Sequence, residues 1–555
     1  MWIAEIHIKT TCNHVKVFVN IYAIVRCDGT VVTVVCEILL LLPESIGNKR
    51  NKRGRKMTEY VYPTKIIFAE EVEHAEHLLM RKDLQIGLCE ENTVSVSPGA
   101  TLVLDFGKEL RGGIRILTYS TDHLSYISVR IRFGESLSEC YADLGQKNAT
   151  NDHSPRDIVV TLSPWSNLSF ADTGFRFVRI DVLSDAHFEI KSIVAKSQEL
   201  RKKAIYEYTG DDPEIAAIFS AAKRTIDLCS VGRYVYDGIK RDRLVWVGDM
   251  YPEMLALVSL YGAFKPLETS LDFAKSQYKL PLYMYDMPTY SLWWIVIISD
   301  YYALTGREKF TRSQLAYLQG LLQLFSEKVD ENGQFNIHSH FVDWPTVGTS
   351  DEYIGSVFLA IAAYQKGIAL LEAFGRDAEP FKPVLKRLMK NNMHVETQKQ
   401  VIGLKYFALG EISDEEYATL IKDGANGFST FMSYPILKAI ASRDHALAIE
   451  LMKSYYGAML SIGATTFFED FDLKWLDSAG RIDSLPQPGQ EDIHGDRGKH
   501  CYVGYRHSLC HGWASGVIAF IKEEVSGYSL NINKKNAARP SGSAVPMIGT
   551  VHFNI

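Results

Sequence analysis

The chain has few cysteines, and their positions imply neither a cross-link nor a metal. Its 555 residues include eight, at Cys12, Cys27, Cys36, Cys89, Cys140, Cys229, Cys501 and Cys510, and none forms a CxxC pair. A disulfide framework or a zinc ribbon needs regularly spaced cysteines, so we expect neither. Reduced thiols in a cytoplasmic protein are the simplest interpretation, and we expect no metal and no cofactor.

The chain also lacks a long apolar run and a strong excess of charge of one sign. No stretch of 18 apolar residues exists, and the apolar residues 31–43 contain Glu37 and lie too far along the chain to resemble a secretory signal. The formal net charge is only -6. We therefore expect neither a membrane span nor nucleic acid as the main partner, and we expect a cytoplasmic location.

Length and composition indicate a globular protein of several domains. Hydrophobic residues make up 46% and charged residues 23% of the chain. A chain of this length is longer than one hydrophobic core usually accommodates, so two or three domains are expected. The basic run at 48–56, NKRNKRGRK, favours a solvated linker over a nuclear or nucleic-acid signal. We expect residues 1–56 to be an upstream extension and the functional protein to begin near Met57.

Residues 93–198 alternate with a period of two. Segments such as GATLVLDFG, GGIRILTY, YISVRIRFGES, DIVVTLS and FRFVRIDVLS place β-branched or aromatic residues at every second position, between clusters of turn-forming residues. This pattern predicts an antiparallel β-sandwich of two packed sheets over residues 57–200. Nothing in it indicates catalysis.

From about residue 210 the spacing of apolar residues becomes helical, and the segment TGDDPEIAAIFSAAKRTIDLCS predicts a first helix. Ten further helices are predicted at 250–262, 266–278, 291–305, 311–329, 352–374, 380–391, 413–422, 430–441, 444–456 and 513–524, and another at about 396–408. Several are apolar nearly all round, as in SLWWIVIISDYYAL, so they need burial on more than one side. These features predict an all-α (α/α)6 six-hairpin barrel over 201–525. A helical solenoid is the alternative, but no fixed-period repeat supports it.

Two loops combine acids with aromatic rings. Residues 236–253 include the three carboxylates of Asp237, Asp242 and Asp249. Three cations and an indole lie among them, namely Lys240, Arg241, Arg243 and Trp246. Residues 463–475 place Glu469, Asp470 and Asp472 among three phenylalanines and Trp475. A carboxyl against aromatic rings is where burial raises a pKa or a sugar face stacks. The alternatives are a structural salt-bridge cluster and an acidic loop anchored by aromatics.

Two shorter segments add further candidates. HFVDWPT at 340–346 offers Asp343 and Trp344. RHSLCHGWASG at 506–516 offers His507, Cys510 and His511, but three ligands without a second set at zinc spacing favour a substrate-facing histidine over a metal. No GxSxG element indicates a serine nucleophile.

The motifs together resemble those of glycoside hydrolase family 78, the bacterial α-L-rhamnosidases. DGIKRDRLVWVGD resembles the central family motif, GATTFFEDFD the later stretch that ends in a catalytic Glu, FVDWPT the Gly-Asp-Trp loop, and SLCHGWASG a His-containing helix start. Their order agrees, and the resemblance covers about 95–520. It implies a β-sandwich before an (α/α)6 barrel, and a rhamnose-containing oligosaccharide or glycoside as the partner.

The resemblance also implies roles for single residues. Asp242 matches the general acid and Glu469 the general base. Asp237 and Asp249 match acidic residues that hold the hydroxyls of the sugar, and Trp246 matches an aromatic residue of the same pocket. His511 matches a histidine that contacts the substrate. We add Arg241, Asp343 and Trp344 as substrate-binding candidates from the same loops. Family members invert the anomeric centre, and inverting enzymes hold the two carboxyls about 6.5–9.5 Å apart so that water fits.

The methyl group of rhamnose, a 6-deoxy sugar, needs an apolar wall. Our hypothesis is that Trp246, Trp344 and Phe468 form this wall. The chain departs from the family in two places. Asp242 stands where most members carry Glu, which withdraws the carboxyl by one methylene. After the last predicted helix only a short tail at 526–555 follows, where the family places another β-domain.

Three functions stay open from the sequence. The first is release of terminal α-L-rhamnose by an inverting mechanism. The second is an (α/α)6 glycosidase for another sugar, because fold and acid pair would not change. The third is an inactive sugar-binding homologue, which would tolerate loss of one catalytic acid. Both acids are present, which favours an enzyme. No motif supports an oligomer.

Overall fold

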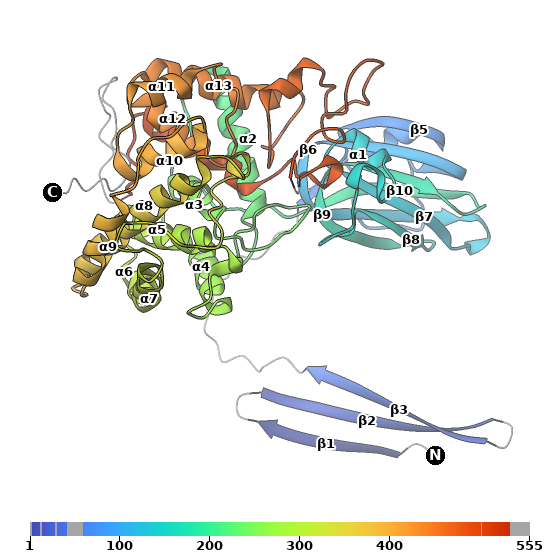
Figure 1. Cartoon of the computed structure of the whole chain (residues 1–555). Coiled ribbons are helices and arrows are strands. Elements are labelled where there is room, and N and C mark those ends of the chain that lie inside the picture. The colour runs from blue at the N-terminus through green and yellow to red at the C-terminus, as the bar shows by residue number, and fades with distance from the viewer. Residues whose placement is uncertain (1–2, 12–13, 28–29, 42–58, 501, 533–555) are drawn as a thin grey trace. The chain divides into compact units, whose positions relative to one another are not determined.

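The structure, a computed structural model, describes residues 3–11, 14–27, 30–41, 59–500 and 502–532. The chain forms two compact units, Met1–Met57 and Thr58–Ile555. The first unit contains a three-stranded antiparallel sheet of β1 (Ile3–Thr11), β2 (His14–Cys27) and β3 (Thr30–Leu41), in that order (Figure 1). The basic run at 48–56 and the tail beyond residue 532 lie outside the described residues.

The second unit begins with a seven-stranded sheet, which we call the sheet region (residues 59–197). Its strands are β4 (Glu59–Val61), β5 (Lys65–Glu73), β6 (Val94–Thr121), β7 (Ile127–Gly134), β8 (Asp157–Leu162), β9 (Asn167–Val182) and β10 (Phe188–Ser197). Hydrogen bonds link them in the order β4-β10-β6-β9-β7-β8, with β5 on β6. In every pair the partner residues run in opposite directions, as Ser192 with Leu117 and Ser197 with Gly112 do between β10 and β6, so the sheet is antiparallel. A two-sheet sandwich stays a prediction.

Strand β6 is one 28-residue element where the sequence predicts two separate strands. Its pairing with β9 shifts register between Asp105 and Leu110 and again after Gly112. At Gly112 the backbone φ is +146°, and a Cβ atom would lie 2.1 Å from the carbonyl oxygen of Lys196. Only glycine lets β6 continue this close to β10, so the strand bends and does not break.

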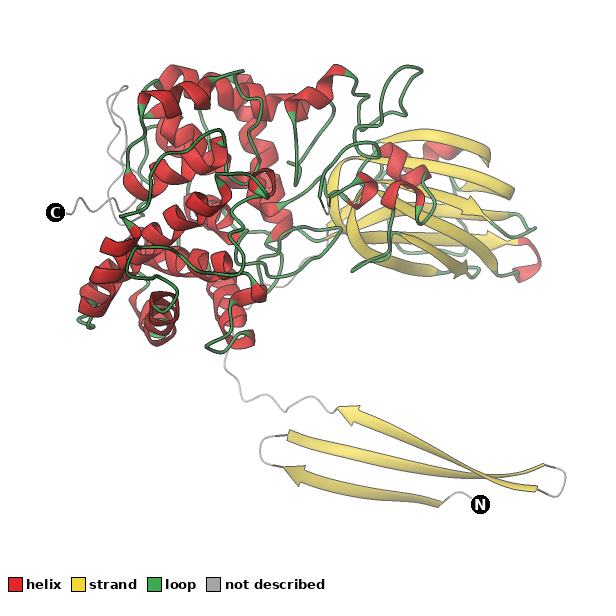
Figure 2. Cartoon of the chain, viewed as in Figure 1, coloured by secondary structure: helices red, strands yellow, loops and turns green. Residues whose placement is uncertain are grey.

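The second part of the unit is a helical region (residues 213–525), whose helices are red and whose loops are green in Figure 2. Its helices are α2 (Pro213–Cys229), α3 (Met250–Tyr261), α4 (Lys265–Gln277), α5 (Pro288–Thr305), α6 (Glu308–Arg312), α7 (Leu315–Ser326), α8 (Glu352–Ala373), α9 (Lys382–Leu388), α10 (Lys399–Leu409), α11 (Asp414–Ile421), α12 (Ser433–Ala441), α13 (His445–Ser461) and α14 (Val517–Phe520). Each predicted helix is present, with shifted ends, and α10 confirms the one expected near 396–408. The sheet region followed by a helical region confirms the predicted order of fold types.

Six of these helices contact one another in chain order. Helix α3 contacts α5, α5 contacts α8, α8 contacts α10, α10 contacts α12, and α12 contacts α14, which in turn contacts α3. These helices are the apolar ones: α3 and α12 have no exposed residue, and α5 is buried over nearly its whole length. Their all-round apolar sequences therefore follow from contact on several sides.

Among the described residues, one helix is long and apolar enough to cross a membrane. It is α8, with 22 residues, and 89% of its most apolar window is buried inside the protein. Its neighbours α5 and α10 cover it, so its composition is that of a core helix.

We expect Trp294→Ala to destabilise the protein by about 3–5 kcal/mol, because truncating a fully buried Trp leaves a cavity among α5 and its neighbours. Trp294 is 0% exposed, whereas Trp165 in the sheet region is 50% exposed. Thermal unfolding of the wild type, Trp294→Ala and the matched control Trp165→Ala measures the difference. Equal shifts in the two variants would contradict a core that depends on Trp294.

Candidate functional site

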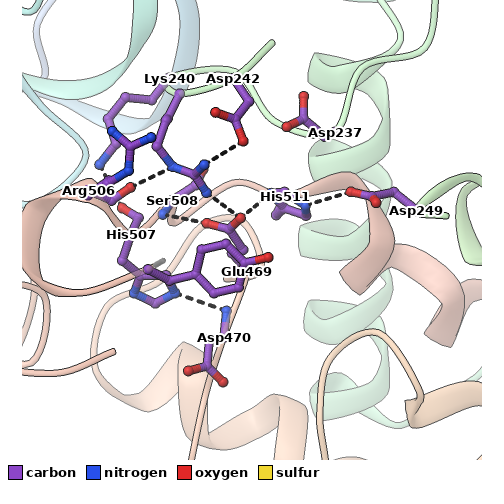
Figure 3. A network of polar contacts seen from close by, with 12 residues as sticks. Asp237, Lys240, Asp242, Asp249, Glu469, Asp470, Arg506, His507, Ser508 and His511 are labelled. Atoms are coloured by element: carbon purple, nitrogen blue, oxygen red, sulfur yellow. Dashed lines mark hydrogen bonds and ion pairs between the residues drawn. The ribbon is translucent and has the colours of Figure 1, made fainter. Parts of the chain in front are cut away.

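Three segments far apart in the sequence are joined by backbone hydrogen bonds at the site. The amide of Gly512 donates to the carbonyl of Asp237 at 2.6 Å, and that of His511 donates to Phe467 at 3.0 Å. The amide of Glu469 donates to Ser508 at 3.0 Å. The loop before α3 and the loops around Glu469 and His511 are therefore joined, and their polar side chains converge (Figure 3).

Arg241 lies at the centre of this group. One terminal nitrogen of its guanidinium donates to Oε1 of Glu469, and the other lies 2.5 Å from Oδ2 of Asp242. Its Nε donates to the carbonyl of Arg506 at 2.9 Å, and the Tyr502 ring lies 5.2 Å away. The predicted acid and the predicted base therefore both contact the fork of one cation.

The backbone at Asp242 is in the left-handed region, with φ of 55°. Arg243 follows with φ of 53°. Such angles cost about 1–3 kcal/mol for residues other than glycine and persist where the surroundings impose them. Here Arg241 donates to the carboxylate of Asp242 and is itself held by Glu469, and these contacts hold the turn. The contacts of its carboxylate with Arg241 and His153 therefore fix the direction in which Asp242 points.

Glu469 is 2% exposed and fully engaged. Its Oε2 accepts from the amide of Ser508 at 3.2 Å, and its Oε1 lies 3.6 Å from Nδ1 of His511. Burial alone would raise the pKa of Glu469, but the charges of Arg241 and His511 act more strongly and lower it. Glu469 is therefore ionised at neutral pH, the state that a general base requires.

His511 joins Glu469 to Asp249. Its Nε2 lies 3.1 Å from Oδ2 of Asp249, the residue directly before α3. Burial opposes the charged ring, but Glu469 and Asp249 raise the pKa of His511 to about 9. The ring is thus an imidazolium at neutral pH. Burial also raises the pKa of Asp249, against the effect of His511.

Asp237 is a buried carboxyl that keeps its proton. It is 3% exposed, and its Oδ1 accepts from the amide of Leu244 at 2.8 Å. Burial raises the pKa of Asp237 to about 8. The site therefore combines a protonated carboxyl with an ionised one at the same pH, which is the division of labour that acid–base catalysis needs.

Aromatic rings line one side of the site and connect the remaining predicted residues. Trp246 lies 4.6 Å from the Tyr285 ring and 6.1 Å from the Tyr290 ring. Tyr290 lies 6.2 Å from Phe341, and Phe341 lies 5.0 Å from Trp344. The row of rings thus joins Trp246 of the loop before α3 to the 340–346 loop.

The 340–346 loop reaches Arg241 through Tyr502, because the indole of Trp344 donates to the Tyr502 hydroxyl. Asp343 accepts from the amide of Trp344 at 2.8 Å and from the hydroxyl of Ser429 at 2.5 Å. Burial raises the pKa of Asp343 to about 7. The structure therefore brings all nine predicted site residues into one connected group.

Phe468 differs from the other two residues of the proposed apolar wall. Trp246 and Trp344 are partly exposed, whereas Phe468 is 1% exposed and packs edge-on against Phe471 and His507. Its ring contacts therefore anchor the loop directly before Glu469. Two of the three candidate wall residues thus have exposed ring surface.

The three candidate metal ligands of the last motif have separate partners. Nε2 of His507 accepts from the amide of Asp470 at 2.9 Å, which fits a ring whose pKa burial holds well below its ordinary value. The Cys510 thiol contacts the carbonyl of Thr225, and His511 contacts Asp249. Within the described residues, neither group of possible ligands that lie close together includes any of the three.

Sequence reasoning missed several residues that the fold adds. Glu253 follows Asp249 by one helical turn, a spacing that could have identified it; it is 1% exposed, and both of its carboxylate oxygens lack a hydrogen-bond partner. Burial and the charge of Asp249 raise its pKa well above the ordinary value. His153 of the sheet region lies 3.4 Å from Oδ1 of Asp242, a contact that no sequence signal announces.

We expect Asp237→Asn to gain stability relative to the wild type as pH rises from 5 to 8. The pKa of Asp237 is raised from 3.8 to about 8. Between these values the native state binds a proton that the unfolded chain has released, so the wild type loses up to about 1.4 kcal/mol per pH unit from this group. Asn cannot titrate, so the variant avoids this loss.

Thermal unfolding at several pH values measures the difference between variant and wild type. Asp211→Asn, at an exposed aspartate in the turn before α2, is the matched control. A difference for Asp237→Asn that stays constant across this range would contradict a protonated Asp237.

Comparison with known proteins gives no match among protein-family models and none among curated protein sequences. Solved structures do match. The rhamnosidase from Klebsiella oxytoca, solved with rhamnose bound, has a TM-score of 0.63 at 17% identity over 84% of this chain and 96% of its own. The GH78 family rhamnosidase of Bacillus sp. GL1 gives 0.62 at 17% identity over 81% of this chain and 48% of its own.

The α-L-rhamnosidase from Aspergillus terreus gives a TM-score of 0.54 at 15% identity over 78% of this chain and 53% of its own. This chain thus spans about half the length of the Bacillus and Aspergillus proteins and nearly all of the Klebsiella protein. At these identities the likeness concerns the fold. Over most of its length, the chain has the fold of the GH78 α-L-rhamnosidases.

Proposed function

We propose that the protein is a glycoside hydrolase that releases terminal α-L-rhamnose from oligosaccharides or glycosides with inversion of the anomeric centre. The observation that carries this proposal is the contact of both Asp242 and Glu469 with the guanidinium of Arg241, beside the buried Asp237 and the His511–Asp249 pair. The fold shared with solved rhamnosidases supports a glycosidase.

In this mechanism Glu469 is the general base. Its pKa is lowered by Arg241 and His511 against the effect of burial, so it is ionised and able to take a proton from the attacking water. Asp242 is the general acid that protonates the departing oxygen. Sugar hydroxyls that bind Arg241 compete with Asp242 for the guanidinium and free the Asp242 carboxyl to face the departing oxygen.

The remaining predicted residues bind the sugar. Arg241 and the imidazolium of His511 donate hydrogen bonds to hydroxyl oxygens, and Asp249 and Asp343 orient them. Asp237 is the second candidate for the proton donor, because burial keeps its carboxyl protonated at neutral pH. The partly exposed rings of Trp246 and Trp344 form the apolar wall for the 6-deoxy methyl group.

The finer architecture belongs to the same proposal. We propose that residues 57–200 are a β-sandwich domain and residues 201–525 an (α/α)6 barrel of six helix hairpins. The closed series of contacts among α3, α5, α8, α10, α12 and α14 supports an inner ring, with the helices between them outside. A cytoplasmic location stays a prediction.

Two other functions are outcomes of the same test. A six-hairpin glycosidase for another sugar would keep both acids and change the wall at Trp246 and Trp344. A non-catalytic sugar-binding protein would bind rhamnose without cleaving a rhamnoside. The engaged state of both Asp242 and Glu469 favours the enzyme, because a binding site needs only one of them.

We expect the wild type to hydrolyse p-nitrophenyl α-L-rhamnopyranoside in preference to a panel of other nitrophenyl glycosides. Glu469→Gln and Asp242→Asn each remove one partner of the acid–base pair and should lower kcat by about 100-fold or more. Release of nitrophenol measures the rate. The matched controls are Glu450→Gln and Asp477→Asn, which change exposed acids and should keep wild-type rates.

Cleavage of another glycoside in the panel would move the assignment to that sugar. Rhamnose binding by calorimetry without any cleavage would identify a binding protein. Full activity of Asp242→Asn together with loss in Asp237→Asn would transfer the acid role to Asp237.

We expect the first product to be β-L-rhamnose, because an inverting enzyme places water on the face opposite the departing group. Proton NMR of the anomeric signal in the first minutes, before mutarotation, identifies the product. An initial α-anomer would show retention and would assign one of the carboxylates as a nucleophile.

A further inference from the structure

A buried charged cluster joins the sheet region to the site loop. The ammonium of Lys240 lies 3.0 Å from Oε2 of Glu135 and 3.2 Å from Oε1 of Glu139. It also donates to the carbonyls of Tyr505 at 2.9 Å and of His507 at 2.7 Å. The side chain of Lys240 is 7% exposed and those of both glutamates 0%. Lys240 directly precedes Arg241 and Asp242 in the chain.

Glu135 has a second contact, on the side that carries the general base. Its Oε2 accepts from the amide of Leu509 at 2.7 Å. The amide of the preceding residue, Ser508, donates to Oε2 of Glu469 at 3.2 Å, and Glu469 in turn donates its own amide to the carbonyl of Ser508. One carboxylate of the sheet region thus binds both chain segments that hold Asp242 and Glu469 (Figure 3 labels Lys240 and Ser508).

The sheet region holds Glu135 rigidly. Glu135 follows the end of β7, and its amide donates to Oε2 of Glu139 at 2.8 Å. Glu139 lies in the short helix α1 (Leu137–Tyr141), which Ser136 caps through the amide of Glu139. Arg156 donates to the carbonyl of Glu139 at 2.8 Å. Glu135 is thus anchored to the sheet and reaches into the helical region.

The cluster is built around the cation of Lys240 and does not need a metal. Ligand atoms of Glu135, Glu139 and His494 lie within 4.8 Å of one another. The Lys240 ammonium lies beside all three, 3.4 Å from Nε2 of His494. Nε2 of His494 also contacts the carbonyl of His507 at 2.9 Å. Burial raises the pKa of Glu135, and the charge of Lys240 counters this rise, so the lysine serves as the counter-ion.

We propose that Glu135 is a positioning residue for hydrolysis, which sets the separation of Asp242 and Glu469 by binding Lys240 and the amide of Leu509. It acts through these two groups and touches no reacting atom. This inference rests on the proposed function. Acid–base chemistry is sensitive to such placement, because an error of about 1 Å in the position of a reacting group costs about 100-fold in rate.

We expect Glu135→Gln to lower kcat by about 100-fold while KM changes by no more than about threefold. The glutamine keeps the shape of the side chain and an oxygen for the amide of Leu509, but it loses the charge that binds Lys240. Lys240→Met should cause a similar fall, and the double variant should fall no further, because both changes break the same link.

The matched control is another buried lysine–carboxylate pair. Lys366 contacts Asp300 at 2.8 Å inside the helical region, and Asp300→Asn should lower the Tm while kcat stays at the wild-type value. A Glu135→Gln variant that loses Tm as the control does but keeps wild-type kcat would overturn the proposal. Additive losses of kcat in the Glu135→Gln, Lys240→Met double variant would overturn it as well.

Hydrogen exchange gives a test that does not depend on activity. In Glu135→Gln, amide exchange should become faster in residues 238–245 and in 506–511, while residues of α5 exchange as in the wild type. Unchanged exchange in both loops would overturn the positioning role. If the wild type cleaves no glycoside, the proposed function fails, and the exchange data still decide whether Glu135 orders the two loops.

Discussion

The site depends on one buried guanidinium. Arg241 is 4% exposed and binds Glu469 on one side and Asp242 on the other. A buried cation is stable only when it is paired and its hydrogen bonds are satisfied, which here requires both carboxylates and the carbonyl of Arg506. Three features accompany these contacts of Arg241: the left-handed backbone at Asp242, the burial of Glu469 and the position of the loop that carries Arg506.

Burial then divides the acids into two classes. Glu469 lies against Arg241 and His511, and its pKa falls despite burial. Among the described residues no cation forms an ion pair with Asp237, and burial raises the pKa of this carboxyl to about 8. The same low-dielectric surroundings thus give opposite results, because the distance to a positive charge decides which form of a carboxyl is favoured. The site therefore holds a protonated carboxyl and an ionised one at the same pH.

The sheet region takes part in this electrostatic design. Glu135 and Glu139 form ion pairs with Lys240, and His153 lies beside Asp242. Without these two glutamates the buried ammonium of Lys240 would lose both of its ion pairs. The sheet region thus supplies the counter-charges that let this loop be buried, a role that period-two strands alone do not reveal.

The sequence by itself determined the two fold types and the loops that matter, because apolar period and turn residues are local properties. Alternation indicated the strands, all-round apolar segments indicated the buried helices, and acids beside aromatics indicated Asp237, Asp242, Asp249 and Glu469 as candidates. The sequence pattern predicted two strands where the structure has one, because Gly112 keeps β6 continuous. Only the tertiary structure decided which charges meet, as at Glu135 and Lys240, because ion pairs and pKa values depend on distance and burial between segments that are remote in the chain.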